Sequence, residues 1–143
     1  MSESPVFFFS EKIRLPSISK LKIQAWLVKA LEEEKHALTQ LCIIFCNDQY
    51  LAEMNKRYLK KNTLTDVIAF SYDKPGSKNV YGDVFISIDR VKENATKFNL
   101  SFKSELHRVI IHGVLHLCGY EDKTKPGISK MRKTEDHYLR QIN

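Results

Sequence analysis

The segment 104–122 constrains the fold more than any other part of this 143-residue chain. Its apolar residues recur at helical spacing and, at about 100° per residue, form one stripe of a helix; they are Leu106, Val109, Ile110, Gly113 and Leu117. Counted from Leu106, His112 and His116 fall at about 240° and 280°, at the edge of this stripe. The segment therefore predicts a helix that packs its apolar face on a core and carries two histidines into a half-buried cleft.

The two histidines have the spacing of a metal-binding pair. His112 and His116 are four residues apart, which on a helix places their Cβ atoms about 5–6 Å from each other on one face. Gly119 allows the chain to leave the helix and turn back, so that Asp122 can supply a third ligand. Glu121 or a water molecule stays open as the alternative to Asp122. We therefore predict that His112, His116 and Asp122 bind one metal ion.

Three protein ligands indicate a catalytic ion rather than a structural one. Histidine and carboxylate ligands with an open fourth position are typical of catalytic zinc. Such an ion lowers the pKa of a bound water from 15.7 to roughly 7 and polarises a substrate oxygen. We predict one zinc ion per chain and hydrolytic chemistry carried by the metal-bound water. No side chain is a clear general base, so the catalytic side chains stay unassigned.

Gly113 separates this pattern from a protease motif. Two histidines four residues apart, then Gly119 and a ligand at position 122, have the spacing of the metzincin proteases, which carry Glu directly after the first histidine as general base. Here that residue is Gly113. Because peptide hydrolysis would lack its proton acceptor, the pattern argues against a protease.

The remaining periodicity predicts alternating strands and helices. β-Branched and aromatic residues predict strands over 6–9, 41–46, 65–72 and 84–88. Helical spacing and polar caps predict helices from Ser17 or Ser19 through Leu31, from Asn47-Asp48 through Tyr58, from Asp89 towards Phe98, from residue 101 or 103 to Leu117, and around Met131, Tyr138 and Leu139. This order predicts a mixed α/β (α+β) fold, with one mixed sheet of about four strands and about five helices. The length fits one domain, so we expect residues 1–143 to form a single domain.

Composition favours an anionic partner. The net charge is +6 and the sequence pI is near 9.2, with basic clusters at 56–61 and 123–133, and such a balance favours nucleic acid. No apolar run approaches the ~20 residues that a membrane span needs. Three cysteines without a C-x-x-C pair predict no disulfide framework. We therefore expect a cytoplasmic protein without a membrane partner.

Four ordered blocks of the chain resemble a known family. His112–Asp122 reads His-Gly-Val-Leu-His-Leu-Cys-Gly-Tyr-Glu-Asp and resembles the signature His-Gly-x-Leu-His-Leu-x-Gly-Tyr-Asp-His of the YbeY family, the metal-dependent endoribonucleases of ribosomal RNA maturation. Met54–Tyr58 and Thr65–Phe70 are similar to the family's Leu-Asn-x-x-Tyr and Thr-Asp-Val-Leu-Ser-Phe, and Tyr81–Ser87 is similar to its Leu-Gly-Asp-Ile-x-Ile-Ser. Together the blocks cover about residues 40 to 140.

The resemblance implies a single α/β domain, a zinc site of three side chains, and cleavage of single-stranded RNA in ribosome biogenesis, including maturation of the small-subunit rRNA 3′ end. Ribosomal proteins or the small ribosomal subunit are implied partners. The chain departs from the family where Asp122 replaces the common third histidine, and where Leu59 replaces a frequent Arg. We expect the basic cluster around this second position to bind RNA phosphates, through Arg57, Lys60 and Lys61.

Two other functions stay open. A ribosome-assembly factor could bind RNA or a ribosomal protein without cutting, with a structural metal; the missing Arg and the changed third ligand favour it. A metal-dependent hydrolase of small molecules or amides is favoured by the metzincin-like spacing and disfavoured by Gly113.

Overall fold

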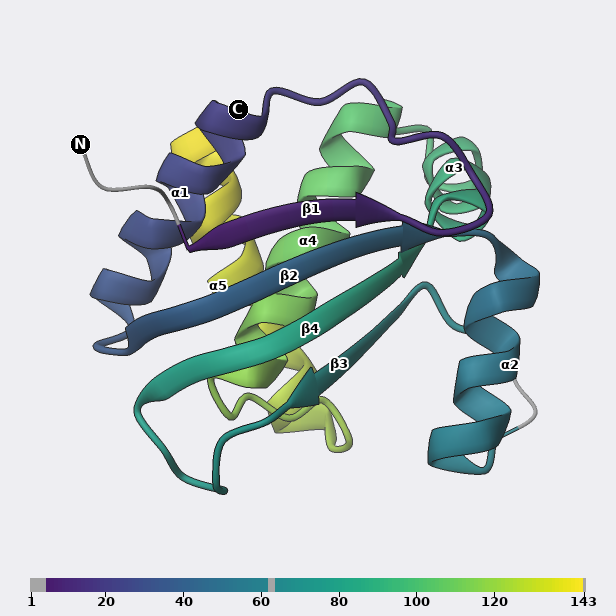
Figure 1. Ribbon diagram of the computed structural model, residues 1–143. Helices are drawn as coiled ribbons and strands as arrows, with labels where there is room; N and C mark the ends of the chain where they lie inside the picture. Colours follow the sequence, from purple (N-terminus) through teal and green to yellow (C-terminus); the bar gives the residue numbers. More distant parts are fainter. Residues whose placement is uncertain (1–4, 62–63, 143) are drawn as a thin grey trace.

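Residues 5–61 and 64–142, which the computed structural model describes, contain one four-stranded sheet (Figure 1). Its strands are β1 (Val6–Ser10), β2 (Ala37–Cys46), β3 (Val67–Ser71) and β4 (Asn79–Ser87), in the order β1-β2-β4-β3. The strands β1, β2 and β4 run parallel, and β3 pairs antiparallel with β4. The predicted mixed sheet is therefore confirmed, with the hairpin of β3 and β4 at one edge.

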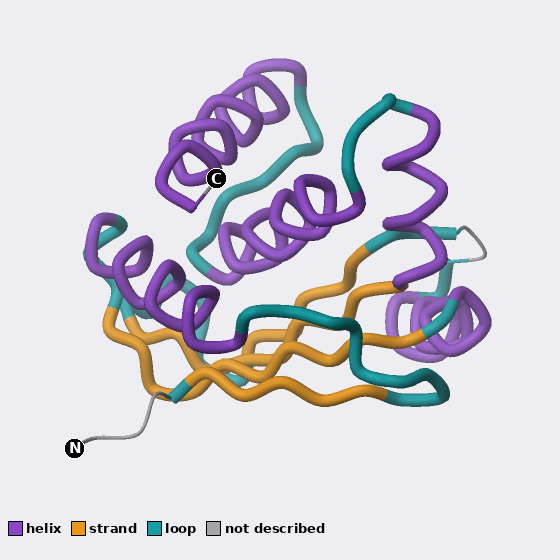
Figure 2. The backbone as a smooth tube through the Cα atoms, turned by 90° about the horizontal axis from the view of Figure 1, so that it is seen from above, coloured by secondary structure: helices purple, strands orange, loops and turns teal. Residues whose placement is uncertain are grey.

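Helices cover the sheet mainly on one face. The described residues form α1 (Lys20–Glu33), α2 (Asp48–Leu59), α3 (Ile88–Lys97), α4 (Phe102–Leu117) and α5 (Lys125–Ile142). Seen from above, α1 and α4 lie on the same side of the sheet, and α5 packs against both of them farther from the sheet (Figure 2). None of these helices is both long enough and apolar enough to cross a membrane.

The main core lies between the sheet and α1, α4 and α5. Alternate residues of β2, namely Leu41, Ile43 and Phe45, are fully buried on this face, together with Val84 and Ile86 of β4. Burying such a side chain stabilises the fold by about 1.5–3 kcal/mol. The helix α4 therefore rests on the middle of the sheet and is held there by apolar packing.

A smaller core under α2 lies on the other face of the sheet. It contains Cys46, Leu51 and Ile68, with Phe70 and Phe85 packed against them. Because successive side chains of a strand point to opposite faces, Cys46 contributes here while its neighbour in β2 faces the main core. This packing places α2 beside β3.

The predicted order of elements is confirmed, but one cap differs. Ser87, not Asp89, caps α3, because its hydroxyl accepts a hydrogen bond from the Arg90 backbone N–H at 3.3 Å. The carboxylate of Asp89 instead accepts a hydrogen bond from the Asp48 backbone N–H at 2.9 Å. The fourth strand begins earlier than predicted, at Asn79, where it pairs with Ala37 of β2, and ends at Ser87.

Two details of the helices do not follow from apolar spacing alone. In α1, Leu21 is 82% exposed, whereas Ile23 lies in the core. Pro126 and Gly127 belong to the first turn of α5, which begins at Lys125. Proline is tolerated there because its missing N–H would have no partner within the helix.

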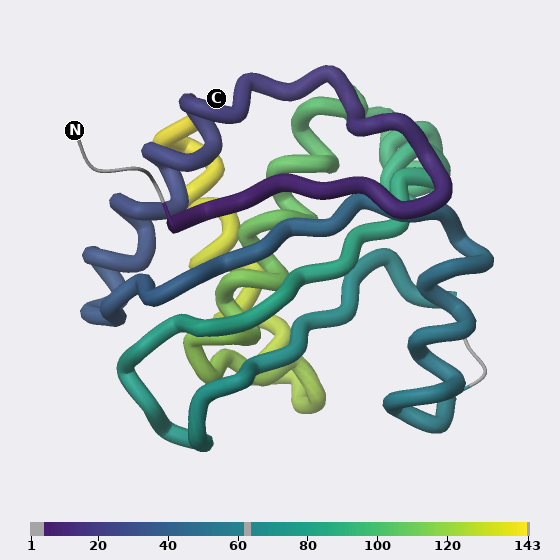
Figure 3. The backbone as a smooth tube through the Cα atoms, in the orientation of Figure 1, coloured from purple at the N-terminus to yellow at the C-terminus, as the bar shows by residue number. Residues whose placement is uncertain are grey.

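Gly113 brings α4 into close contact with the sheet; in the backbone tube of Figure 3 this helix, drawn in green, crosses behind the strands. A Cβ atom at this position would lie 2.5 Å from Cγ1 of Val84 and 3.0 Å from Cγ2 of Val67. Both distances are shorter than ordinary van der Waals contact, so only glycine allows this approach. The residue after His112 therefore faces the sheet, and a metzincin-type Glu would find no room there.

We predict that Gly113→Ala lowers the stability of the fold. Overpacking a core typically costs about 1–3 kcal/mol, and a methyl group 2.5 Å from a fully buried valine belongs in the upper part of that range. Removing a helical glycine offsets at most about 1 kcal/mol of this cost. Urea unfolding should therefore show a lower midpoint. Lys103→Ala, on the exposed first turn of α4, should change stability by no more than ~0.5 kcal/mol, and an unchanged midpoint for Gly113→Ala would contradict the close packing.

Candidate metal centre

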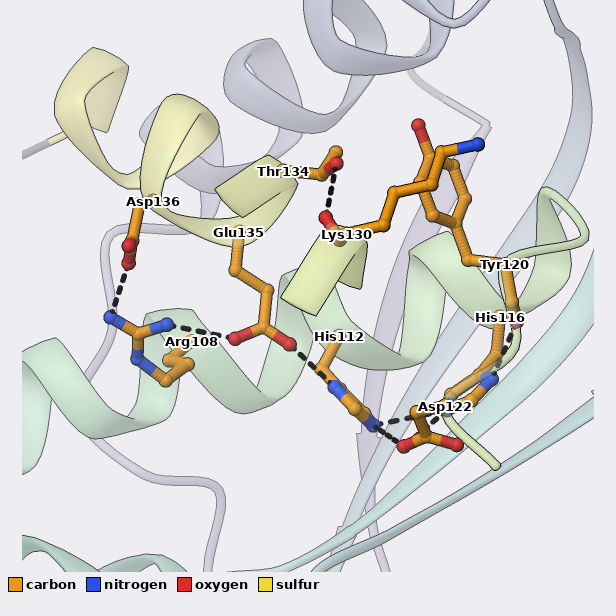
Figure 4. A network of polar contacts seen from close by, with 9 residues as sticks. All are labelled: Arg108, His112, His116, Tyr120, Asp122, Lys130, Thr134, Glu135 and Asp136. Atoms are coloured by element: carbon orange, nitrogen blue, oxygen red, sulfur yellow. Dashed lines mark hydrogen bonds and ion pairs between the residues drawn. The ribbon is translucent and has the colours of Figure 1, made fainter. Parts of the chain in front are cut away.

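The three predicted ligand side chains meet near the C-terminal end of α4 (Figure 4). The Nε2 atoms of His112 and His116 lie 3.0 Å apart. Oδ2 of Asp122 lies 3.4 Å from Nε2 of His112 and 3.6 Å from Nε2 of His116. These three atoms, which we call the ligand triangle, are close enough to hold one metal ion.

Gly119 ends α4 and turns the chain back towards the histidines. Its φ of 99° is a left-handed conformation that suits glycine. The Gly119 N–H donates to the His116 carbonyl at 3.0 Å and the Tyr120 N–H to the Leu115 carbonyl at 3.1 Å, which is the pattern of a Schellman motif. The predicted turn is confirmed. It also positions the Tyr120 carbonyl to accept a hydrogen bond from Nδ1 of His116 at 3.0 Å.

Close contact with α5 holds the loop that carries Asp122. A Cβ atom on Gly127 would lie 2.7 Å from the Glu121 carbonyl oxygen, so glycine lets the loop and the helix touch. The hydroxyl of Thr124 accepts a hydrogen bond from the Gly127 N–H at 3.1 Å, and its carbonyl accepts one from the Ile128 N–H at 2.8 Å. The loop is therefore fixed at both ends, and Asp122 rather than Glu121 contributes the carboxylate of the triangle.

Each imidazole is oriented by an acceptor on its other nitrogen. Nδ1 of His112 donates to Oε2 of Glu135 at 2.6 Å, and Nδ1 of His116 donates to the Tyr120 carbonyl. Neither an ionised carboxylate nor a carbonyl can donate a hydrogen bond. The proton of each neutral ring is therefore on Nδ1, and the lone pair on each Nε2 points into the ligand triangle.

The triangle fits a divalent transition metal. Two nitrogen lone pairs only 3.0 Å apart require a positive charge between them, either a proton or a metal ion. Tetrahedral Zn–N bonds of about 2.0–2.1 Å place neighbouring ligand atoms about 3.3–3.4 Å apart. The observed separations of 3.0, 3.4 and 3.6 Å span this value, and two imidazoles with one carboxylate form a donor set of the kind such ions prefer.

The two imidazoles differ in how readily they take up a proton. Burial by itself lowers the pKa of His112, but the hydrogen bond and charge of Glu135, with Asp66 and Asp122, outweigh burial and raise that pKa. Burial and the charge of His112 lower the pKa of His116. Protonation of one imidazole therefore disfavours protonation of the other, and a metal ion must displace any proton that either Nε2 carries.

Glu135 is a buried carboxylate that the sequence analysis did not identify. It is 4% exposed and accepts a hydrogen bond from Nη1 of Arg108 at 2.8 Å in addition to that from His112. Burying a carboxylate is costly unless it is paired, and Arg108 provides the pairing. The only signal in the sequence was an acidic residue on the apolar stripe of the last helix.

A second set of hydrogen bonds supports the site from the C-terminal end of α1. The hydroxyl of Tyr120 donates to Oε1 of Glu34 at 2.8 Å, and the hydroxyl of Tyr138 donates to the other oxygen of the same carboxylate. Nζ of Lys130 lies 5.3 Å from the centre of the Tyr120 ring. The residue whose carbonyl orients His116 is therefore itself held by α1 and α5.

Two hollows meet at the ligand triangle. The helix hollow, of about 620 Å³, is lined by His112, Asp122 and Asp66 and extends between α3, α4 and α5. The strand hollow, of about 590 Å³, is lined by His116 and Asp122 and extends between α2 and β3. Both volumes are in the range of ligand sites. Burial raises the pKa of Asp66, and the charge of His112 opposes this effect.

Basic side chains border both hollows, but only some of those predicted. Lys61 and Lys123 line the strand hollow, and Arg132 lines the helix hollow. Arg57 and Lys60 are exposed on or after the last turn of α2 and line neither. Of the three residues predicted to bind phosphate, Lys61 alone therefore lines a hollow that the ligand triangle borders.

Comparison with known proteins identifies the family. The family model described as Endoribonuclease YbeY matches residues 9–143. This chain belongs to the YbeY family. The Endoribonuclease YbeY of Cytophaga hutchinsonii is 43% identical to it, with 97% of this chain and 96% of the relative covered. That of Amoebophilus asiaticus is 41% identical, with 97% and 94% covered. A solution structure from Thermotoga maritima has a TM-score of 0.65 over 96% of this chain and 88% of its own, at 23% identity, which shows a shared fold.

Three of the four sequence blocks that resemble those of YbeY proteins border the strand hollow. Asn55 from one block and Thr65 and Ala69 from the next line it. Leu59, which stands where YbeY proteins often carry Arg, lines it as well, and Lys61 is the neighbouring cation in the same lining. Lys61 is therefore better placed than Arg57 to compensate for the missing Arg.

We predict that Glu135→Gln weakens metal binding through His112. Removing the partner that orients a ligating histidine typically costs about 10–100-fold in metal affinity. Competition with a chelator would measure the dissociation constant. Asp136→Asn is the matched control, because Asp136 also pairs with Arg108, at 2.8 Å, but has no bond to His112. Equal losses in both variants would mean that the charge around Arg108 matters, and not the orientation of the imidazole.

Proposed function

We propose that this chain is a zinc-dependent, single-strand-specific endoribonuclease that acts in ribosomal RNA processing, at the 3′ end of the small-subunit rRNA, in the cytoplasm. One observation carries the proposal. In a chain of the YbeY family, two imidazole nitrogens and one carboxylate oxygen converge where two hollows meet, and each hollow has at least one basic side chain in its lining.

The donor set favours zinc as the ion held by His112, His116 and Asp122. Zinc accepts imidazole and carboxylate ligands in tetrahedral sites, and three protein ligands leave one position for a substrate or water. The side chains of the three residues are 24%, 30% and 38% exposed, respectively, so this position opens towards the hollows. A structural zinc site would instead be closed by a fourth protein ligand.

The side chains around the ion have separate roles in RNA cleavage. When bound, the ion supplies a Lewis acid that stabilises the negative charge developing on the phosphodiester. Lys61 and Lys123 hold neighbouring phosphates from the strand hollow, as lysines do in other nucleic-acid sites. Glu135 and the Tyr120 carbonyl keep the two imidazoles facing the ion.

The position of the triangle favours unpaired RNA. Its three side chains are partly buried where the hollows meet, so the scissile phosphate has to enter between helices and loops. In a duplex the second strand accompanies every phosphate, whereas an unpaired strand can bend and turn its bases aside. A ribosomal protein or the small ribosomal subunit would present such a strand, and the net charge of +6 favours that encounter.

We predict that zinc and RNA cleavage are lost together. Elemental analysis should find one zinc per chain in the wild type and none in His116→Ala or Asp122→Ala, while Asp122→His, which restores the common family ligand, should keep it. The same preparations should cut an unpaired RNA only where zinc is retained, and should leave a duplex of the same sequence intact. Circular dichroism would establish that the variants are folded.

Three other outcomes would contradict parts of this proposal. Zinc retained in Asp122→Ala would mean that the third ligand is misassigned. Zinc bound without any cleavage of RNA would favour a ribosome-assembly factor that binds RNA around a structural metal. Hydrolysis of model esters or peptides, with RNA left intact, would favour a hydrolase of another substrate.

A further inference from the structure

The helix hollow has an apolar rim that the metal chemistry does not require. Phe98 and Leu100, from the end of α3 and the following connection, are 57% and 46% exposed, and Ile128 of α5 is 52% exposed. Exposed apolar side chains gathered beside a cavity indicate a binding site rather than ordinary surface. The hollow is therefore suited to a flat, largely apolar group next to the ligand triangle.

The carboxylate of Glu105 lies in the wall of this hollow. Glu105 is 5% exposed and lines the hollow, and within residues 5–61 and 64–142 no hydrogen bond or ion pair engages its carboxylate. No side-chain oxygen of these residues is both buried and without a partner, so the oxygens of this carboxylate remain accessible from the hollow. They are accordingly available for hydrogen-bond donors of a ligand.

The charges around Glu105 favour neutral donors. Burial and the charge of Asp66 raise the pKa of Glu105, while the charges of Arg108 and Arg132 lower it. Donated N–H groups would stabilise its ionised form without the cost of burying another cation. Asn94 lines the same hollow and adds an amide that can both donate and accept.

We propose that the helix hollow is a nucleobase subsite that binds an unpaired guanine beside the scissile phosphodiester. This inference rests on the proposed function. A carboxylate has two acceptor oxygens, and guanine alone has two adjacent donors, N1–H and N2–H₂, on its Watson–Crick edge. Adenine and cytosine offer one donor next to an acceptor, and uracil offers a single donor between two acceptors.

The remaining residues of the hollow complete the recognition of the base. Phe98 provides a ring face on which the base stacks, a contact that tolerates any base. Asn94 donates a side-chain amide N–H to O6 of guanine. Arg132, which has no ion pair with any residue in 5–61 or 64–142, neutralises the phosphate attached to the bound nucleotide.

The test measures binding of mononucleotides, so that it does not depend on cleavage. GMP, IMP and AMP share the ribose phosphate and differ only in the base, and IMP lacks the N2 amino group. NMR titration of the metal-loaded protein with GMP should shift the backbone amides of Glu105 and Phe98. A bidentate contact of this kind discriminates by about 10- to 100-fold, so GMP should bind more tightly than IMP or AMP by a factor in this range.

Two variants test the contributions of the Glu105 carboxylate and the Phe98 ring to binding separately. Glu105→Gln should remove most of the preference for GMP, whereas Glu32→Gln, the same change on an exposed part of α1, should leave it intact. Phe98→Leu should weaken all three mononucleotides alike. Since Phe98 is exposed, this second variant remains informative if Glu105→Gln folds poorly.

The outcomes distinguish the subsite from the proposed nuclease activity. Equal affinity for GMP and AMP, an unchanged preference in Glu105→Gln, or shifts confined to residues outside the hollow would overturn the subsite, even if RNA is cleaved. A preference for GMP that depends on Glu105, with no cleavage of any unpaired RNA, would support the subsite and overturn the nuclease proposal.

Discussion

The contact between α4 and the sheet at Gly113 is the constraint on which the site depends. Since no side chain separates this part of the helix from Val84 and Val67, α4 lies close to β4 and β3, and the residue before Gly113 is held at the edge of the core. His112 and His116 therefore emerge where the helix leaves the sheet, with apolar packing on one side and the two hollows on the other. The apolar packing of α4 on the sheet therefore positions the metal-ligand side chains, none of which belongs to the hydrophobic core.

Around this contact, the polar groups are arranged in successive layers. The Nε2 atoms of His112 and His116 face one point. Their Nδ1 atoms donate hydrogen bonds to Glu135 and to the Tyr120 carbonyl, respectively. Glu135 is held in turn by Arg108, and the Tyr120 side chain by Glu34. Partners of this kind fix the tautomer and the direction of each imidazole before an ion arrives. Preorganisation of the ligands is thus shared among α1, α4, α5 and the turn at Gly119.

The sequence was sufficient for features that depend on neighbouring residues. The order of strands and helices, the histidine pair and the turn at Gly119 all follow from local periodicity and from the conformational freedom of glycine. The sequence analysis did not identify the hydrogen bonds between residues that are far apart in the chain. Glu135 meets His112 over 23 positions and Tyr120 meets Glu34 over 86, and no local pattern encodes such pairs. For the same reason no local pattern shows that His107 is buried, although it is 4% exposed and packs beside Trp26.

The carboxylates that line the helix hollow have an electrostatic consequence for the order of events. Asp66, Glu105, Asp122 and Glu135 surround one side of the site, and Arg108 is already engaged by Glu135. Although the chain is basic overall, the local potential at this point attracts a cation and repels a phosphodiester. We therefore expect ordered addition, in which the ion binds first and reverses the sign of the field that an approaching RNA strand meets. The acidic lining would in this way keep the metal-free protein from occupying RNA that it cannot process.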